Sequence, residues 1–333
     1  MIPVVDGHND ALLRAWRSGE SLRERSSNGH LDLPRMRDGG VVAGFFAIFV
    51  PATDDEPSDP RAPLVLTHDG YEVPMEGALP FERADRIARE LAAIAERDLR
   101  IVTRADDVLG GNAILHLEGA EPIAPDLSNL CEWFERGLRS VGLVWSRPNA
   151  FGHGVPFRYP GSPDTGPGLT DAGRALVRAA NELGLVLDLA HLNERGFFEV
   201  AAASTAPLVV SHAGAHELCR IPRNLTDDQL DTVRDSDGVV GVVFDTVMTR
   251  EDGELVLETP LQTIAEHIEY IADRIGIDHV ALGSDFDGSF PPHALDDVSK
   301  TQALLETLAW SDDELAKLAH GNWLRVLRAT WKT

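Results

Sequence analysis

Eight short apolar runs, separated by stretches with helical periodicity, constrain the fold of this chain most strongly. The runs are residues 2–5, 41–50, 113–117, 140–145, 185–190, 207–211, 238–244 and 279–283. Most are apolar on both faces, as the buried strands of a parallel sheet are. Eight such strands alternating with helices predict a (β/α)8 TIM barrel. An open doubly wound sheet is the alternative, but no glycine-rich phosphate loop follows the first run.

Helix start and stop signals occupy several of the intervals. The predicted helices are residues 81–97, 171–183, 227–234, 260–275 and 312 to about 320. Thr170, Thr226 and Ser311 stand at expected N-cap positions, and Gly184 and Gly276 stand at expected helix ends. The last of these segments predicts extra C-terminal helices beyond the eight strands.

The length and the irregular segments fit one barrel domain over residues 1–333. Barrels of this class typically need about 250 residues and tolerate insertions. Two stretches rich in proline and glycine, 51–80 and 147–169, each follow a predicted strand. We expect both to be loops over the barrel mouth, where they would wall a substrate pocket.

Charge and hydropathy narrow the class of partner. The net charge is −24, which argues against nucleic acid and anionic membrane surfaces as partners. No apolar run approaches the roughly 20 residues of a membrane span, and no signal peptide is visible. We therefore expect a cytoplasmic protein that acts on small molecules. The two cysteines, Cys131 and Cys219, form no disulfide or zinc-ribbon pattern and are expected in the core.

Polar residues follow the predicted strands at the carboxyl ends, where barrel enzymes place their chemistry. These residues are His8 and Asp10, Glu118, His191, His212, and Asp285 with Asp287. Any one of them alone fits an ordinary turn, but together they indicate a metal site. Imidazole and carboxylate suit Zn²⁺, Mn²⁺ or Co²⁺. If five of these residues are ligands, they are too many for one catalytic zinc with an open position. Five ligands suit two ions about 3.5–4 Å apart, bridged by a carboxylate and a hydroxide. His116 is expected to support this site.

Seven motifs, in order along the chain, resemble those of the membrane (renal) dipeptidase family, which are binuclear zinc peptidases of the amidohydrolase-like barrel superfamily. The motifs are DGHND at 6–10, HLDLPRMRDGGV at 30–41, EGAEPI at 118–123, SHAGAH at 211–216, IPRNLTDD at 221–228, GSDFDG at 283–288 and GNWLRVL at 321–327. They span nearly the whole chain, so the resemblance covers the fold as well as the site.

The resemblance implies a role for each residue that matches a family motif. His8 and Asp10 would bind the first of two zinc ions, Glu118 would bridge both, and His191 with His212 would bind the second. Mn²⁺ or Co²⁺ could replace zinc. It further implies that Asp285 is the general acid and base and that Arg223 holds the carboxylate of the substrate.

Two positions depart from the family pattern and concern substrate contacts. Trp145 stands four residues before Asn149, where family members often carry a histidine near the scissile carbonyl. His153 is a candidate to supply that imidazole, and Asn149 is expected near the substrate too. Asp245 stands where some members have a tyrosine, so it would repel a substrate carboxylate or select a cationic side chain.

The resemblance implies a soluble homodimer of bacterial type that hydrolyses dipeptides, with L-Xaa–D-Xaa dipeptides among the candidate substrates, by a metal-bridging hydroxide. Another amidohydrolase, acting on an amide, lactam or N-acyl bond of a small carboxylated metabolite, is the alternative that Trp145 keeps open. A non-catalytic, metal-stabilised binding barrel is a third possibility. Such a barrel would not need Asp285 or Arg223.

Overall fold

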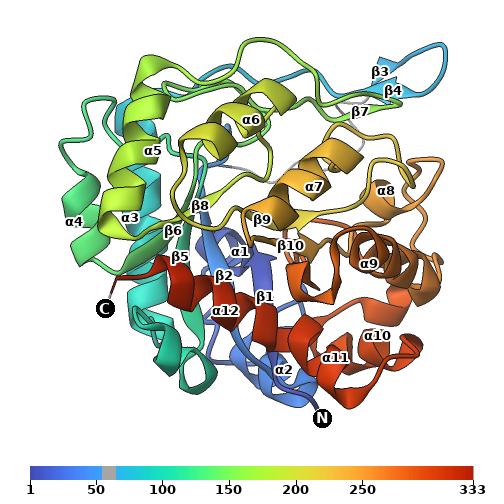
Figure 1. Cartoon of the computed structure of the whole chain (residues 1–333). Helices are drawn as coiled ribbons and strands as arrows, with labels where there is room; N and C mark the ends of the chain where they lie inside the picture. Colours follow the sequence, from blue (N-terminus) through green and yellow to red (C-terminus); the bar gives the residue numbers. More distant parts are fainter. Residues whose placement is uncertain (55–64, 333) are drawn as a thin grey trace.

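Eight parallel strands form the barrel in a computed structural model that describes residues 1–54 and 65–332 (Figure 1). Their order around the sheet follows the chain, and their bounds are β1 Val4–Asn9, β2 Val41–Phe49, β5 Ala113–Glu118, β6 Leu138–Gly142, β8 Val186–Asp188, β9 Val209–Ala213, β10 Val239–Val242 and β11 Val280–Leu282. The predicted (β/α)8 class is confirmed. A second, antiparallel sheet joins β3 Val65–Leu66, β4 Tyr71–Glu72 and β7 Arg158–Tyr159, and it lies near the top of Figure 1.

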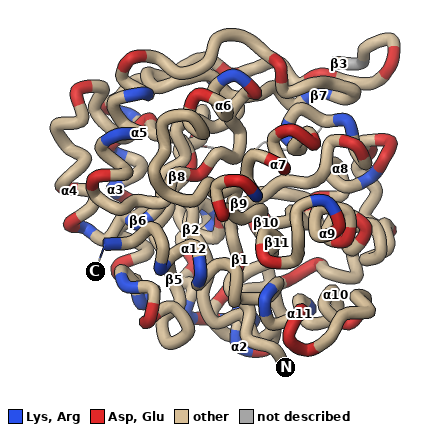
Figure 2. Tube along the Cα trace, viewed as in Figure 1, with Lys and Arg blue, Asp and Glu red and all other residues tan. Residues whose placement is uncertain are grey.

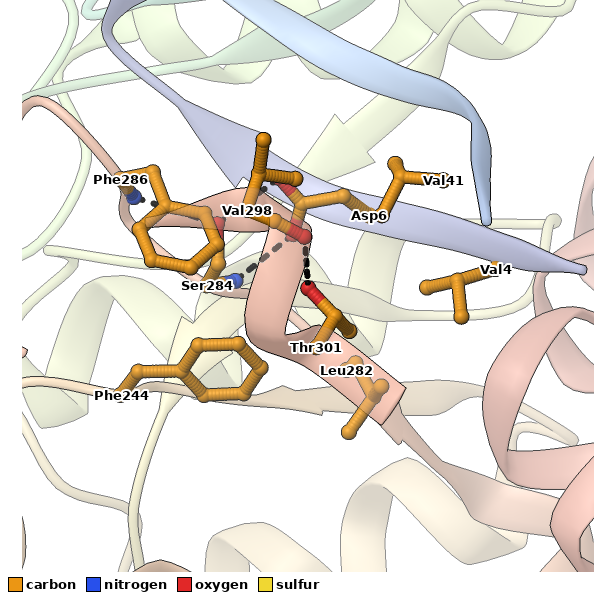
Figure 3. A pocket seen from close by; sticks show the side chains of 9 residues that line it. All are labelled: Val4, Asp6, Val41, Phe244, Leu282, Ser284, Phe286, Val298 and Thr301. Atoms are coloured by element: carbon orange, nitrogen blue, oxygen red, sulfur yellow. Dashed lines mark hydrogen bonds between the residues drawn. The ribbon is translucent and has the colours of Figure 1, made fainter. Parts of the chain in front are cut away.

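The seam between the first and last barrel strands closes through a few specific contacts. Asn9 and Phe286 form a parallel bridge, and the Asp285 backbone N–H donates to the His8 carbonyl at 3.0 Å. Below this bridge, the Asp6 carboxylate accepts bonds from the Ser284 N–H at 2.7 Å and from its hydroxyl at 2.8 Å. Figure 3 shows these two side chains at a small enclosed pocket beside Phe286. Burial raises the pKa of Asp6 to about 6.

Helices surround the strands and continue after the last one. Their bounds are α1 Ala11–Ser18, α2 Leu33–Gly39, α3 Phe81–Asp98, α4 Leu130–Glu135, α5 Asp171–Leu183, α6 Glu194–Ala203, α7 Asp227–Asp235, α8 Thr246–Thr249, α9 Leu261–Ile275, α10 Thr301–Thr307, α11 Asp312–Ala316 and α12 Asn322–Thr330. Short 3₁₀ turns cover Ala105–Gly110, Ile277–His279, His293–Leu295 and Val298–Lys300. The predicted caps are confirmed, because the hydroxyls of Thr170, Thr226 and Ser311 each accept a backbone N–H of the first turn.

Several predicted ends of strands, helices and loops are wrong. His8 and His212 lie inside β1 and β9 rather than after them, because both strands run further than their apolar residues. The strand predicted at 140–145 ends at Gly142, which leaves Trp145 in the following loop. The helix predicted to end near 320 passes through a π turn, Lys317–Gly321, into α12. The predicted loop 51–80 contains β3 and β4, and its residues 55–64 lie outside the described part of the chain.

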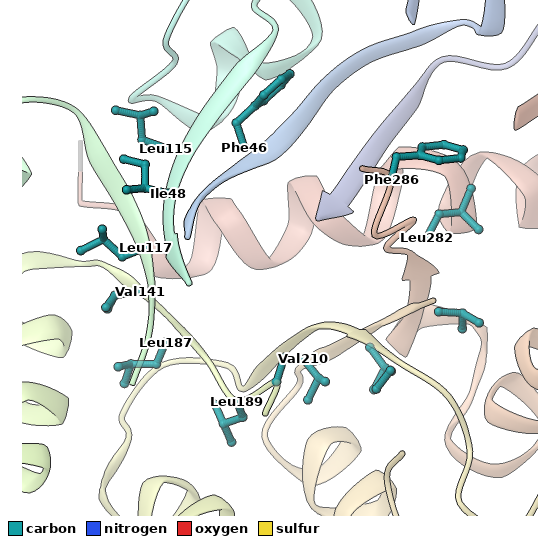
Figure 4. Close-up of a cluster of buried hydrophobic side chains, with 14 of the residues drawn as sticks. Phe46, Ile48, Leu115, Leu117, Val141, Leu187, Leu189, Val210, Leu282 and Phe286 are labelled. Atoms are coloured by element: carbon teal, nitrogen blue, oxygen red, sulfur yellow. The ribbon is translucent and has the colours of Figure 1, made fainter. Parts of the chain in front are cut away.

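The main core fills the layer between the strands and the outer helices. Figure 4 shows part of it, with Phe46 and Ile48 of β2, Leu115 and Leu117 of β5, and Val210 of β9 among the labelled side chains. These residues alternate along each strand with others that face the barrel interior, as the two-residue repeat of a strand requires. The barrel wall is therefore packed with apolar side chains on its outer side.

Trp323 of α12 closes the floor of the barrel. Its side chain is fully buried, and its indole N–H donates to the Leu282 carbonyl at 3.0 Å. A Cβ at Gly7 would lie only 2.4 Å from this indole, so β1 needs glycine where the ring enters. Phe45 packs against the same indole, with 5.0 Å between the ring centroids. The extra C-terminal helices are thus an integral part of the barrel.

Surface features agree only partly with the sequence-based expectations. Acidic and basic residues are interspersed over the outer helices and loops (Figure 2). Cys219 is buried as expected, but Cys131 is exposed because it lies on the outer side of the short helix α4. Among the described residues, no helix combines the length and apolar character that crossing a bilayer requires.

Candidate metal centre and substrate site

The barrel brings the five predicted metal ligands together at its mouth. His8 Nε2 lies 3.4 Å from Asp10 Oδ2 and 3.5 Å from Glu118 Oε1. The same Glu118 oxygen lies 2.9 Å from His191 Nε2 and 3.7 Å from His212 Nε2, and these two nitrogens are 3.2 Å apart. All five residues are buried. Glu118 therefore stands between a His8–Asp10 group and a His191–His212 group.

These spacings fit donor atoms that share a metal ion. Two ligands bound tetrahedrally at about 2.0–2.1 Å are about 3.3 Å apart, close to most of the separations above. Neither ring nitrogen of His8 makes a hydrogen bond within the described residues, and Asp10 Oδ1 likewise has none. Buried polar atoms are normally hydrogen-bonded, so these free atoms suit a cation. Residues His8, Asp10 and Glu118 would hold one divalent ion, and Glu118, His191 and His212 a second.

The carboxylates determine the electrostatics of His8 in the absence of metal. Burial opposes protonation of the ring, but Glu118 and Asp10 outweigh it and hold the pKa of His8 well above its usual value. Burial lowers the pKa of His191 to about 3, and the nearby Arg223 adds to the effect. His191 is therefore neutral at pH 7, as a metal ligand must be.

A hydrogen-bond chain fixes the tautomer of His212. The Ser211 hydroxyl donates to Asp188 Oδ2 and lies 2.8 Å from His212 Nδ1. A hydroxyl has one hydrogen to donate, and Ser211 donates it in the hydrogen bond to the Asp188 carboxylate. The Ser211 oxygen must then accept a hydrogen bond from Nδ1–H, which leaves a lone pair on His212 Nε2. That nitrogen is the one that faces Glu118.

Two further serine–histidine pairs lie beside the site. The Ser146 hydroxyl is 2.8 Å from His191 Nδ1, which orients that ring with Nε2 toward Glu118. His116 Nδ1 lies 3.0 Å from the Ser140 hydroxyl, and its Nε2 lies 3.4 Å from Asp188 Oδ2. The donor atoms of His8, His116 and Asp188 form another close group. Because Asp188 already accepts three hydrogen bonds, we assign it and His116 to supporting the ligands.

The loop after β11 holds Asp285 close to the predicted ligands. Asp285 Oδ1 lies 3.9 Å from His8 Nε2, and burial raises the pKa of Asp285 well above its usual value. Its φ is 60°, a left-handed conformation that costs a non-glycine residue energy and occurs often at functional sites. Gly288 allows this geometry, since a Cβ there would lie 2.2 Å from Asp10 Oδ2 and 2.5 Å from Asp285 Oδ1.

Asp287 holds the loop after β11 through hydrogen bonds to Arg14 and His30. Arg14 Nε donates to Asp287 Oδ2 at 3.0 Å, and the Asp287 N–H donates to His30 Nδ1 at 2.9 Å. The sequence reasoning placed Asp287 with the polar residues at the strand end. Its carboxylate is used by Arg14 and by the His30 N–H, so it shapes the loop that carries Asp285.

Arg223 follows β9, and Asp245 follows β10. The Arg223 guanidinium is buried; Nη2 donates to the His212 carbonyl at 3.2 Å, while Nε has no partner within the described residues. Asp245 caps α8 by accepting from the Val247 N–H at 3.2 Å. Burial raises the pKa of Asp245 to about 6, although the Arg223 charge opposes the rise. Arg223 thus has donors to spare for an anionic group.

Trp145 lies in an aromatic group beside His191, with 5.7 Å between their ring centroids. Phe49 and Phe157 flank the indole at 5.1 and 5.5 Å. Arg147, which the sequence reasoning missed, is fully buried and places its guanidinium carbon 5.2 Å from the indole centroid. The only sequence signal for Arg147 is its position two residues after Trp145.

His153 and Asn149 have internal partners in the structure. His153 Nδ1 lies 3.3 Å from the Gly168 carbonyl. Asn149 donates to the Leu143 carbonyl at 2.8 Å and accepts from the Phe151 N–H at 2.8 Å. Both residues therefore stabilise the loop after β6, and their roles in substrate binding stay predictions.

Comparison with known proteins identifies the family. The model of the membrane dipeptidase family, peptidase family M19, matches residues 1–333. The chain belongs to this family. Membership makes it a metal-dependent hydrolase that acts on peptide bonds, a metallo-dipeptidase by class, and confirms the resemblance that the motifs indicated.

Solved structures of the family superpose on the whole chain. The metallopeptidase described as dipeptidase AC is 42% identical, with a TM-score of 0.93, covering 100% of this chain and 99% of the other. A metallopeptidase from Rhodobacter sphaeroides, bound to a phosphinate mimic of L-Ala-D-Ala, is 42% identical with a TM-score of 0.90 and 99% coverage of both chains. Dipeptidase aclJ of Aspergillus oryzae is 30% identical over 98% of this chain and 78% of its own.

Proposed function

We propose that the chain hydrolyses dipeptides at a site that holds two divalent metal ions, with zinc as the preferred ion and Mn²⁺ or Co²⁺ as substitutes. One observation carries the proposal: Glu118 Oε1 lies within 3.7 Å of a ring nitrogen of each of three histidines, His8, His191 and His212. A carboxylate surrounded in this way by imidazole nitrogens is suited to bridge two cations. When bound, the ions would supply Lewis acidity and a bridging hydroxide as nucleophile at neutral pH.

Asp285 would move the proton. Its carboxylate would accept the proton of the attacking water and then donate it to the leaving amine, so that one side chain acts first as base and then as acid. Burial raises the pKa of Asp285, which favours the protonated form that would donate to the leaving amine. The strained loop and the neighbouring Gly288 keep this carboxylate fixed close to His8.

Arg223 would bind the substrate carboxylate. A planar guanidinium fits a carboxylate with two parallel hydrogen bonds, and the Nε of Arg223 has no partner within the described residues. A clamp on the terminal carboxylate beside the His212 backbone would favour dipeptides over longer chains. Asp245, buried close to Arg223, would disfavour a second negative charge there.

The test is the release of amino acids from a library of L-Xaa–L-Xaa and L-Xaa–D-Xaa dipeptides. The metal-loaded wild type should cleave a subset, and Asp285→Asn should lower kcat/KM by about 100-fold or more. Asp252→Asn is the matched control, since Asp252 is exposed and outside the site. If two ions bind but no dipeptide is cleaved, the proposal fails. The enzyme would then act on another amide, lactam or N-acyl bond, as Trp145 in place of a histidine would allow.

The remaining expectations extend the same proposal. We propose a homodimer of single-domain chains in the cytoplasm. Light scattering coupled to size-exclusion chromatography would measure the assembly, and fractionation of the source cells would measure the location. Metal analysis of protein purified without added metal would identify the ions and their number per chain.

A further inference from the structure

Trp145 is the centre of an aromatic wall beside the metal-binding residues. We use this name for Phe49, Trp145 and Phe157, which come from β2 and the loop after β6. All three residues are half-buried. Trp145 contacts both phenyl rings and lies 5.7 Å from the His191 ring, and Phe157 lies 6.3 Å from that same ring. A group bound next to His191 would therefore meet this wall.

The Arg147 guanidinium packs against two rings of the aromatic wall. Its guanidinium carbon lies 5.2 Å from the Trp145 ring centroid and 5.3 Å from that of Phe49. The guanidinium donates to Glu121 at 2.8 Å, to Glu76 at 2.9 Å and to the Val50 carbonyl at 2.7 Å. A fully buried arginine with its fork satisfied on three sides is rigid, and it stacks on aromatic rings more favourably than lysine does.

The strand order places the aromatic wall and Arg223 on either side of β8 and His191. Phe49 ends β2 and Trp145 follows β6, whereas Arg223 follows β9 and Asp245 follows β10. In the order β1-β2-β5-β6-β8-β9-β10-β11, β2 lies opposite β9 in the closed ring, and β6 is separated from β9 by β8, the strand before His191. The metal-binding residues lie between the aromatic wall and Arg223. A dipeptide whose carboxylate is bound by Arg223 would direct its N-terminal residue toward the wall.

We propose that the aromatic wall makes the enzyme selective for dipeptides whose N-terminal residue has a large, flat apolar side chain. Trp145 is the specificity-determining residue, and Arg147 is a positioning residue that acts through it. The inference rests on the proposed dipeptidase function and on Arg223 as the carboxylate-binding group. A ring that stacks on Trp145 and Phe157 gains contacts that a methyl group lacks.

The experiment compares kcat/KM for three dipeptides, Phe–Ala, Ala–Ala and Ala–Phe, in metal-loaded enzymes. Wild type should prefer Phe–Ala over Ala–Ala by about tenfold or more, the scale on which an apolar pocket discriminates. Ala–Phe should show no such gain. Trp145→Leu should bring the Phe–Ala to Ala–Ala ratio close to one, and Trp145→Phe should restore most of it. A role confined to folding would lower all three substrates together.

Arg147→Lys tests the positioning role, with Arg139→Lys as its matched control. Arg139 also places its guanidinium over a phenyl ring, 4.1 Å from the Phe134 centroid, but on the outer side of the barrel. Arg147→Lys should lower the Phe–Ala preference several-fold while metal content stays at the wild-type level. Arg139→Lys should leave the preference unchanged. An unchanged preference in Arg147→Lys would overturn the positioning role.

Inhibition by phosphinate dipeptide mimics separates this inference from the proposed function. A mimic with an N-terminal benzyl side chain should inhibit more strongly than its methyl counterpart, and Trp145→Leu should remove the difference. If dipeptides are cleaved but neither substrates nor inhibitors show an N-terminal preference, the inference fails and the dipeptidase function stands. If no dipeptide is cleaved, the function fails, and the two inhibitors still report whether the wall binds a ring.

Discussion

Replacing Asp188 by asparagine should reverse the hydrogen-bond chain that prepares His212. Asp188 Oδ1 accepts from the backbone N–H groups of Ser211 and Ala190, at 2.8 and 3.1 Å. The asparagine oxygen would keep these two bonds, which places its NH₂ group toward the Ser211 hydroxyl. The hydroxyl must then accept from the amide and donate to His212 Nδ1. The proton of the ring moves to Nε2, the nitrogen that would bind the metal.

The loss of metal affinity in Asp188→Asn follows from the free energy needed to move the His212 proton from Nε2 back to Nδ1. To free Nε2, the ring must carry its proton on Nδ1, where it would face the hydroxyl hydrogen. One buried donor is then unsatisfied, at a cost of about 1–3 kcal/mol. Since about 1.4 kcal/mol is tenfold in affinity, one of the two ions should bind roughly 10–100-fold more weakly. Ser211→Ala removes the acceptor without forcing the wrong tautomer, so its effect should lie at the lower end of this range.

Competition with a chromogenic chelator would measure both metal affinities in the folded protein. Ser140→Ala is the matched control, because it removes the same kind of bond, 3.0 Å long, from His116. Circular dichroism would verify that each variant is folded. Wild-type affinity for both ions in Asp188→Asn, or a larger loss in Ser211→Ala than in Asp188→Asn, would refute the tautomer argument.

Three further predictions address the site loop, the barrel floor and pH. Gly288→Ala should lower kcat/KM by about 100-fold or more, because the new methyl group would displace Asp10 or Asp285; Gly77→Ala, which meets nothing within 4 Å, should not. Trp323→Ala should lower the free energy of unfolding in urea by about 3–5 kcal/mol, and a loss below 1 kcal/mol would contradict its role as the floor. The pKa of Asp245 is raised from 3.8 to about 6 in the folded protein, so ionisation disfavours folding. Metal-free wild type should therefore lose stability relative to Asp245→Asn as pH rises from about 4 to 6, and a gain in that window would refute the assignment.

The sequence was informative where the physics is local. Apolar runs predict the barrel strands because each run is long enough to be a strand. N-cap residues such as Thr170 predict where helices begin, because the cap bonds lie within four residues. The site residues could be proposed because carboxyl ends of parallel strands meet at one rim. Boundaries failed where a strand continues through polar residues, as β9 does through Ser211 and His212.

The features that the sequence did not reveal depend on distant partners. Nothing near Arg147 indicates that Glu76, Glu121 and the Val50 carbonyl will surround its guanidinium. In the sequence, Trp323 is one apolar position of a C-terminal helix, and nothing links it to Gly7, which leaves the space for its ring. The tautomer of His212 depends on Asp188, which belongs to the preceding barrel strand and is separated from it by a whole helix.

The position of Trp323 also has a consequence for the order of events during synthesis. The ring that fills the floor belongs to the last helix, whereas the glycine that receives it belongs to the first strand. Closure of the barrel also requires β1 to pair with the segment after β11, through the bridge between Asn9 and Phe286. A nascent chain that still lacks α12 therefore has an unfilled floor, however many strands have already paired. The barrel around the site is therefore complete only after α12 has been synthesised.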